Sequence, residues 1–219
     1  MKVSNVQSKV GVTLVGGGNP TPEEIVKAMA IAPFLMAADG GANFCVAAGE
    51  EPLVVMGDLD SVSDATRARL ADAEFISIAE QETTDFEKCL TRIDAPFVLA
   101  TGFTQGRLDH TLEAFSVLAR NPGPPTIVTS DTDIAFAVPE FLALDLPEGC
   151  RVSLFPMTKV RGRSEGLQWP IDDMTLDPLQ RTGMSNVSLG KVRLTMDNQG
   201  CLILLPRELL DEAIAALIG

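Results

Sequence analysis

The first 130 residues alternate between short apolar runs and segments with helix-like patterning, and this alternation constrains the fold more than any other feature. Short apolar runs that end at turn residues are typical of strands. Strands that alternate with helices in this way form a parallel sheet with helices on both faces. The expected strands are Val10–Val15, Phe34–Ala38, Leu53–Met56, Glu74–Ile78, Phe97–Ala100 and Thr126–Thr129, and the clearest helices are Asp85–Ile93 and Asp109–Arg120.

The segment after the first expected strand has strong local signals. A glycine-rich loop, Gly16–Gly18, comes first and is followed by Thr21, Pro22 and Glu24. Threonine at an N-cap, proline at the first helical position and glutamate three residues after the cap predict a helix beginning at Pro22. The loop lacks the lysine of a P-loop and the full dinucleotide spacing, so a structural turn is the favoured interpretation.

The pattern changes after about Ser130, where short strand candidates are separated by turn residues. Residues 197–200 predict a hairpin between Lys191–Met196 and Cys201–Leu205. The segment Arg161–Gly183 is rich in Gly, Pro, Asp and Gln and indicates a loop, and Arg207–Ile218 indicates a final helix. We therefore expect an α/β fold with a Rossmann-like parallel sheet in domain 1–130, followed by a smaller, mainly-β domain, 131–219. The other strands expected in this domain are Asp133–Val138, Phe141–Leu144 and Arg151–Met157.

Composition limits the possible partners and compartments. The formal net charge of −13 argues against nucleic-acid binding, which depends on Lys and Arg contacting phosphates. No apolar run approaches the roughly 20 residues of a membrane span, and Met1–Lys9 lacks the apolar core of a signal peptide. We expect a cytoplasmic protein with no membrane partner. The four cysteines are far apart and form no CxxC pair, so reduced and mostly buried thiols are expected.

Two carboxylates follow the third expected strand. Gly57 allows a sharp turn, and Asp58 and Asp60 come directly after it. Ligands bind at the carboxyl ends of strands in an open parallel sheet. Two aspartates held close together there repel each other unless a cation lies between them, which indicates Mg²⁺ carrying phosphates. The simpler alternative is a solvated acidic turn.

Three further polar clusters follow expected strands, and the first two have a simple structural alternative. Asp39-Gly40-Gly41-Ala42 would let backbone amides approach a ligand, or would be a plain turn. Thr84 to Lys88 would form an N-cap followed by Asp85 and Lys88 on one helix face, either as site residues or as a surface ion pair. Gly102 to His110 would deliver Arg107 to a phosphate. The single histidine, His110, is either a packed residue or a catalytic one.

Together these clusters resemble thiamine pyrophosphokinases, the family that transfers a diphosphate from ATP to thiamine. The resemblance covers the whole α/β half and is thinner in the second half. The matching stretches are Asp39-Gly40-Gly41-Ala42, Gly57-Asp58-Leu59-Asp60-Ser61, Thr84-Asp85-Phe86-Glu87-Lys88-Cys89-Leu90, Gly106-Arg107-Leu108-Asp109-His110, Gly166-Leu167-Gln168-Trp169-Pro170 and Gly183-Met184-Ser185-Asn186.

The resemblance implies a role for each matching residue, and a homodimer with thiamine bound between subunits. It implies that Mg²⁺ is held by Asp58, Asp60 and Asp85, which with Arg107 are the catalytic residues. It implies that the ATP site is lined by Asp39, Thr84, Lys88, Arg107 and Asp109. It implies that thiamine is contacted by Gln81, Trp169, Ser185 and Asn186, with the only tryptophan as a stacking platform.

The expected reaction is in-line attack of the thiamine hydroxyl on the β-phosphorus of ATP, with AMP leaving and either Asp85 or Asp60 accepting the proton. Three alternatives stay open from the sequence. A related diphosphokinase would act on a hydroxymethylpterin, and a metal-dependent nucleotide-sugar transferase would also use an Asp-x-Asp pair. The third alternative is a binding module without catalytic activity.

Overall fold

The computed structural model describes residues 6–219, so the first five residues of the Met1–Lys9 stretch lie outside the described part. The chain divides into two compact units. Unit 1 comprises the described residues up to Val117 together with Pro122–Ser130, and unit 2 comprises Leu118–Asn121 and Asp131–Gly219. None of the helices within residues 6–219 is long and apolar enough to cross a bilayer.

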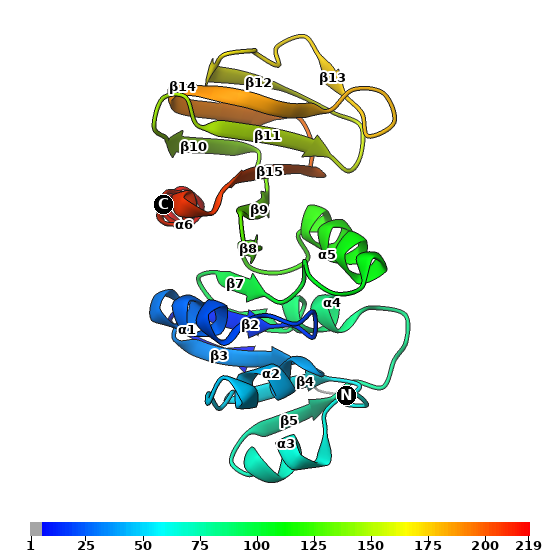
Figure 1. Cartoon of the computed structure of the whole chain (residues 1–219). Helices are drawn as coiled ribbons and strands as arrows, with labels where there is room; N and C mark the ends of the chain where they lie inside the picture. The colour runs from blue at the N-terminus through cyan, green and yellow to red at the C-terminus, as the bar shows by residue number, and fades with distance from the viewer. Residues whose placement is uncertain (1–5) are drawn as a thin grey trace. The chain divides into compact units, whose positions relative to one another are not determined.

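Unit 1 combines parallel strands with helices (Figure 1). One parallel set is ordered β2, β7, β8 and the other β3, β4, β5. Strands β2 and β3 lie side by side. The strands are β2 (Val12–Val15), β3 (Phe34–Ala38), β4 (Val54–Gly57), β5 (Glu74–Ser77), β7 (Val98–Thr101) and β8 (Thr126–Thr129), with a separate short parallel pair, β1 (Val6–Gln7) and β6 (Ile93–Asp94). The helices are α1 (Pro22–Ile31), α2 (Gly41–Ala47), α3 (Asp64–Arg69), α4 (Asp85–Leu90) and α5 (Leu108–Arg120), and the end of α5 from Leu118 on belongs to unit 2.

The core of unit 1 explains why its strands have such apolar sequences. Strands β2, β4, β7 and β8 are buried along their whole length. Strands covered on both faces lose the polar–apolar alternation of a half-exposed sheet and become continuously apolar. Leu35 and Val55 of the sheet pack in one cluster with Ile25 of α1 and Cys45 of α2. The expected mixed α/β fold is therefore confirmed.

The local signals around the helices are mostly confirmed. Thr21 and Glu24 form the reciprocal capping box, with Pro22 as the first residue of α1. Thr84 caps α4. The expected end of that helix at Ile93 is wrong, because α4 ends at Leu90 and Ile93 instead pairs with Val6 in the short parallel pair.

Unit 2 is mainly β, and all its ladders are antiparallel. The strand order is β13–β12–β14–β11–β15–β9, and β10 also pairs with the long strand β14. The strands are β9 (Asp133–Ala137), β10 (Phe141–Asp145), β11 (Arg151–Pro156), β12 (Val160–Leu167), β13 (Thr175–Leu176), β14 (Gly183–Met196) and β15 (Cys201–Pro206). A 3₁₀ turn, Arg207–Leu209, leads into the final helix α6 (Leu210–Ile218).

Two expectations for unit 2 are wrong. Residues 197–200 do connect two strands, but β14 and β15 do not pair with each other because β11 lies between them. The expected loop Arg161–Gly183 contains β13 and all of β12 except its first residue, and it reaches the start of β14. Its polar residues are tolerated in β12 because side chains there alternate between partly and fully exposed positions while the backbone pairs with β14.

The cysteines are free thiols, as expected, and three of the four are buried. Burial raises the pKa of Cys45 to about 12, so this thiol stays protonated at neutral pH. Cys150 is only partly buried.

Candidate active site

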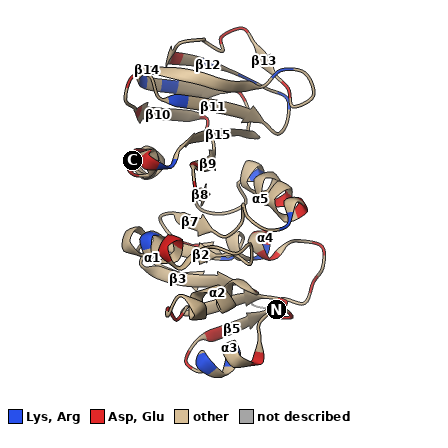
Figure 2. Ribbon diagram, in the orientation of Figure 1, with Lys and Arg blue, Asp and Glu red and all other residues tan. Residues whose placement is uncertain are grey.

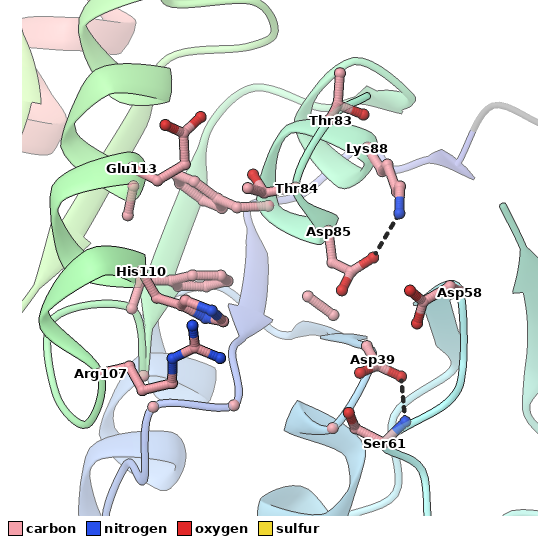
Figure 3. A pocket seen from close by; sticks show the side chains of 18 of the residues that line it. Asp39, Asp58, Ser61, Thr83, Thr84, Asp85, Lys88, Arg107, His110 and Glu113 are labelled. Atoms are coloured by element: carbon pink, nitrogen blue, oxygen red, sulfur yellow. Dashed lines mark hydrogen bonds and ion pairs between the residues drawn. The ribbon is translucent and has the colours of Figure 1, made fainter. Parts of the chain in front are cut away.

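Unit 1 contains a cleft of about 800 Å³ that is lined by residues following β2, β3, β4, β5 and β7 (Figure 3). This is the carboxyl end of the parallel strands, where ligands bind in sheets of this kind. The charged lining residues are Asp39, Asp58, Glu82, Asp85, Lys88, Arg107 and Glu113. Of the two basic ones, Lys88 lies on α4 and Arg107 directly precedes α5. Figure 2 shows the Lys and Arg positions of the chain in blue and the Asp and Glu positions in red. The cleft thus brings together four clusters that are far apart in the sequence.

The wall of the cleft contains two loops whose backbones touch. The amide of Gly18 donates to the carbonyl of Gly102 over 2.8 Å. A Cβ on Gly18 would lie 2.5 Å from the carbonyl of Gln105, so no larger residue fits. Gly17 is different, because the nearest atom to a Cβ there is 3.9 Å away. The loop favoured as a structural turn therefore also lines the cleft.

Three carboxylates form a cluster beside these loops. One oxygen each from Asp39, Asp58 and Asp60 lies within 4.8 Å of the other two. Asp39 is buried and has a positive φ of 43°, and its carboxylate accepts a hydrogen bond from the amide of Ser61 over 3.3 Å. Clustered carboxylates are the donors that a hard divalent cation prefers. The sequence singled out Asp58 and Asp60 for this purpose but assigned Asp39 only to nucleotide binding.

Asp85 lies beside the cluster without belonging to it. A Cβ on Gly57 would lie 2.9 Å from both the Cβ of Asp39 and Oδ1 of Asp85, so this glycine separates the two side chains. Figure 3 shows the carboxylates of Asp39, Asp58 and Asp85 pointing toward one another. Burial raises the pKa of Asp85, and the ammonium of Lys88 opposes that rise. The site therefore holds more negative charge than its own cations balance.

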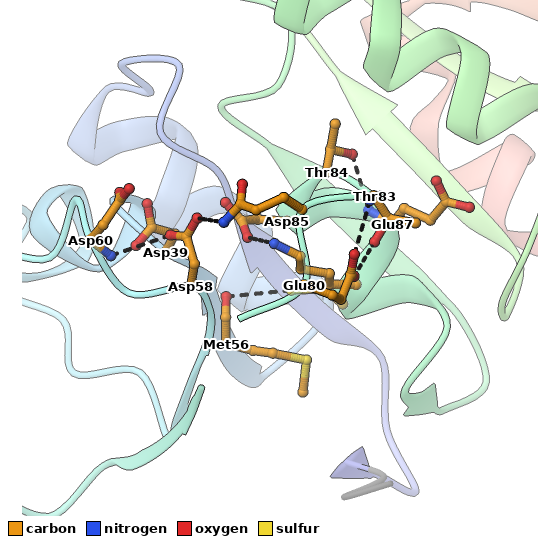
Figure 4. A network of polar contacts seen from close by, with 12 residues as sticks. Asp39, Met56, Asp58, Asp60, Glu80, Thr83, Thr84, Asp85 and Glu87 are labelled. Atoms are coloured by element: carbon orange, nitrogen blue, oxygen red, sulfur yellow. Dashed lines mark hydrogen bonds and ion pairs between the residues drawn. The ribbon is translucent and has the colours of Figure 1, made fainter. Parts of the chain in front are cut away.

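Lys88 is buried, with 2% of its side chain exposed, and its Nζ lies 3.1 Å from Oδ1 of Asp85 (Figure 3). The alternative of a surface ion pair on α4 is therefore wrong. Figure 4 shows Asp85 in the same polar network as Asp39, Asp58 and Asp60. Thr84, the α4 cap, also lines the cleft.

The turn that carries Asp58 and Asp60 is held by side chains from neighbouring segments. Leu59 has a positive φ of 67°, and its carbonyl accepts a hydrogen bond from Arg67 of α3 over 2.5 Å. The guanidinium of Arg67 also lies over the ring of Phe75, 5.4 Å from its centroid. The amide of Gln81 donates to Asp58 over 3.2 Å, and this hydrogen bond is the main reason that the pKa of Asp58 is lowered.

We expect Arg67→Ala to weaken binding of a divalent cation to the acidic cluster by about tenfold, because the strained turn loses its anchor. A titration with Mn²⁺ followed by electron paramagnetic resonance measures this effect. Arg69→Ala is the matched control, since Arg69 lies on the same helix and pairs with the exposed Glu51. Equal effects of the two variants would contradict a specific role for Arg67.

The opposite side of the cleft carries Arg107 and His110 (Figure 3). Both Nε and a terminal nitrogen of Arg107 donate to Asp109, over 3.1 and 2.5 Å. This pair holds the pKa of Asp109 below its usual range. Asp109 and Asp60 are not among the cleft-lining residues of the described chain, whereas His110 is. Phe86 and Phe103 also line the cleft, and the centroids of their rings lie 4.3 Å apart.

The expected thiamine contacts divide between the two units. Gln81 lines the cleft of unit 1. The other three belong to unit 2, where Trp169 is 55% exposed and Asn186 is buried. The side chain of Asn186 accepts from the amide of Trp169 over 3.2 Å and donates to its carbonyl over 2.7 Å. Ser185 has a positive φ of 61°, and its amide donates to Ser153.

Asn43, Ser61 and Phe103 also line the cleft, and sequence reasoning did not assign them to the site. The side chain of Asn43 donates to the carbonyl of Ser61 and accepts from the amide of Ser63, so it ties α2 to the aspartate turn. Asn43 follows the Asp39-Gly40-Gly41-Ala42 motif directly, and this adjacency was the available signal.

Comparisons with known proteins agree with this geometry. A sequence model described as "Thiamin pyrophosphokinase, catalytic domain" matches residues 26–128. A search of curated proteins finds no match. The fold is similar to that of thiamin pyrophosphokinase from Candida albicans (15% identity, covering 94% of each chain, TM-score 0.76). It is also similar to the yeast enzyme (16%, covering 99% of this chain and 90% of that one, TM-score 0.74). A third similar fold is that of thiamin pyrophosphokinase from Geobacillus thermodenitrificans (20% identity, covering 90% of this chain and 96% of that one, TM-score 0.72). The matched segment contains the acidic cluster, Lys88 and Arg107, and it is similar to the catalytic domain of the thiamine pyrophosphokinase family.

Proposed function

We propose that this protein is a thiamine diphosphokinase that transfers a diphosphoryl group from ATP to the primary hydroxyl of thiamine, giving thiamine diphosphate and AMP. The observation that carries the proposal is the match of the family's catalytic domain to the residues that build the cleft. The hydroxymethylpterin alternative finds no support in the comparisons. The same inference extends to a cytoplasmic homodimer, with a Rossmann-like domain 1–130 for ATP and a domain 131–219 for thiamine and dimer contacts.

The donor set of the acidic cluster fits Mg²⁺, because it offers several carboxylate oxygens and no nitrogen or sulfur ligand. We assign Asp58 and Asp60 as ligands, with Asp39 and Asp85 available to complete the set. When bound, the ion would neutralise phosphate charge and hold the phosphates in place. The geometry adds Asp39 to the metal ligands expected from the sequence, which were Asp58, Asp60 and Asp85.

The chain's own cations would act on the triphosphate. Arg107 has the fork geometry to bind phosphate in bidentate fashion. Its present partner, Asp109, is exposed, and ion pairs in water are weak, so phosphate can compete for the guanidinium. Lys88 supplies a second charge from α4. Catalysis of this kind consists mainly of positioning and charge neutralisation.

Thiamine would stack on Trp169 and contact Gln81 and Ser185. Asn186 has its amide group engaged by the backbone of Trp169, so we assign it to positioning the indole. A cation–π contact between the indole and the thiamine ring is physically favourable.

We expect Asn186→Ala to raise the KM for thiamine by about tenfold with little change in kcat, since it loosens the platform and leaves the phosphate side intact. Trp169 is the only tryptophan, so quenching of intrinsic fluorescence by thiamine measures the same change directly. Asn198→Ala is the control, because Asn198 lies in the turn after β14 and is exposed. A normal thiamine KM for Asn186→Ala would contradict the positioning role.

The proposal is tested by product analysis of the purified protein with ATP, Mg²⁺ and either thiamine or a hydroxymethylpterin. We expect AMP and thiamine diphosphate in equal amounts, loss of both with EDTA, and no product from the pterin. Product from the pterin alone would overturn the acceptor assignment. Absence of AMP with either acceptor would favour a binding module.

A further inference from the structure

The cleft contains a buried cation whose position the proposed phosphate contact does not explain. The side chain of Lys88 is 2% exposed, although lysine is rarely buried so completely without a paired charge. Its ammonium forms an ion pair with Oδ1 of Asp85 over 3.1 Å. A buried lysine that loses its partner is strongly unfavourable, so the structure commits Asp85 to Lys88.

The four aspartates of the site are not equivalent. The oxygens of Asp39, Asp58 and Asp60 gather within 4.8 Å of one another, whereas Asp85 is excluded from that group. The carboxylate of Asp85 nevertheless lies close to Gly57, directly beside Asp39, and both Asp39 and Asp58 raise its pKa through their charges. Asp85 is therefore near enough to interact with a cation in the cluster while its own oxygen holds Lys88.

We propose that Lys88 is the resident counter-ion of Asp85 and excludes a divalent cation from this carboxylate until nucleotide phosphate draws the ammonium away. Asp85 then becomes available to the cation held by Asp58 and Asp60. Lys88 thereby couples the two ligands, so that the divalent cation binds more tightly with nucleotide than without it. This inference rests on the proposed function for the identity of the nucleotide, but it concerns binding and not transfer.

The mechanism requires only that the ammonium has two alternative anionic partners. In the structure the partner is Asp85, on the same helix and three residues earlier. A triphosphate in the cleft offers a competing partner, because Lys88 lines the cleft. Since the side chain is flexible and its head group is a compact charge, exchange of partners does not require movement of α4.

The test is Mn²⁺ binding to the full chain, measured by electron paramagnetic resonance with and without α,β-methylene ATP. We expect Lys88→Met to bind Mn²⁺ at least about tenfold more tightly than wild type without nucleotide, and to lose most of the coupling between the two ligands. Lys88→Arg keeps the charge and should bind Mn²⁺ as wild type does. Unchanged or weaker Mn²⁺ binding by folded Lys88→Met, checked by circular dichroism, would overturn the proposal.

A second pair of variants decides the matter if Lys88→Met does not fold. Without nucleotide, Asp85→Asn should bind Mn²⁺ within about twofold of wild type, whereas Asp58→Asn should bind it much more weakly. With the nucleotide analogue, both variants should bind Mn²⁺ weakly. An equal loss of Mn²⁺ affinity in the two variants without nucleotide would overturn the proposal. None of these measurements involves thiamine. The binding proposal can therefore hold even if the protein forms no thiamine diphosphate.

Discussion

Asp58→Asn is expected to lower the turnover of thiamine diphosphate formation at least ~100-fold, because it removes a charge that holds the cation against the phosphates. The asparagine side chain has the same shape and can still accept a hydrogen bond from Gln81 through its carbonyl oxygen. The loss would therefore report on charge more than on packing. Steady-state kinetics at saturating ATP, thiamine and Mg²⁺ measure the effect, and Asp60→Asn should behave alike.

The control for this substitution is Asp72→Asn, at an exposed position beyond the end of α3 and away from the lining of the cleft. It makes the same chemical change without touching the acidic cluster. We expect its turnover to stay within about twofold of wild type, as is usual for surface substitutions. Near-normal turnover in both Asp58→Asn and Asp60→Asn would contradict the metal assignment.

Gly57→Ala is expected to abolish most of the activity and to lower the free energy of unfolding by about 2–4 kcal/mol. The added Cβ would lie 2.9 Å from the Cβ of Asp39 and from Oδ1 of Asp85, so both carboxylates must move. The φ of 154° adds backbone strain for any residue with a side chain. Denaturant unfolding measures the stability change, and product formation measures the activity.

Gly49→Ala is the control that separates backbone strain from steric collision. Gly49 also has a positive φ, 82°, but a Cβ added to it would meet no atom within 4 Å. The substitution should cost about 1 kcal/mol of stability from strain alone and leave turnover unchanged. Equal loss of activity in the two variants would mean that the collision at Gly57 does not disturb the site.

The strands and helix caps of unit 1 were predictable because their signals are local. The capping box at Thr21 and Glu24 depends on residues three apart, and the structure contains it. The end of α4 was not predictable from α4 itself, since Ile93 leaves the helix pattern to pair with Val6, far away in the sequence. The hairpin at residues 197–200 failed for a related reason. Turn residues specify a turn, but they do not exclude insertion of a third strand, β11, between its arms.

The residue types of the site were predictable, but their arrangement was not. Asp58 and Asp60 are separated by a single residue, so their proximity follows from chain geometry. Asp39 joins them only because β3 pairs with β4 and its own φ is positive. The burial of Lys88 likewise depends on what packs around α4, and its spacing from Asp85 also fitted an exposed ion pair.

The most direct test of the central claim is transfer from ATP carrying a radioactive phosphorus in the γ position, with thiamine as acceptor. Attack at the β-phosphorus moves the β- and γ-phosphates together. We therefore expect the label in thiamine diphosphate and an equal amount of unlabelled AMP. Labelled thiamine monophosphate with ADP, or labelled inorganic phosphate alone, would contradict diphosphoryl transfer by this protein.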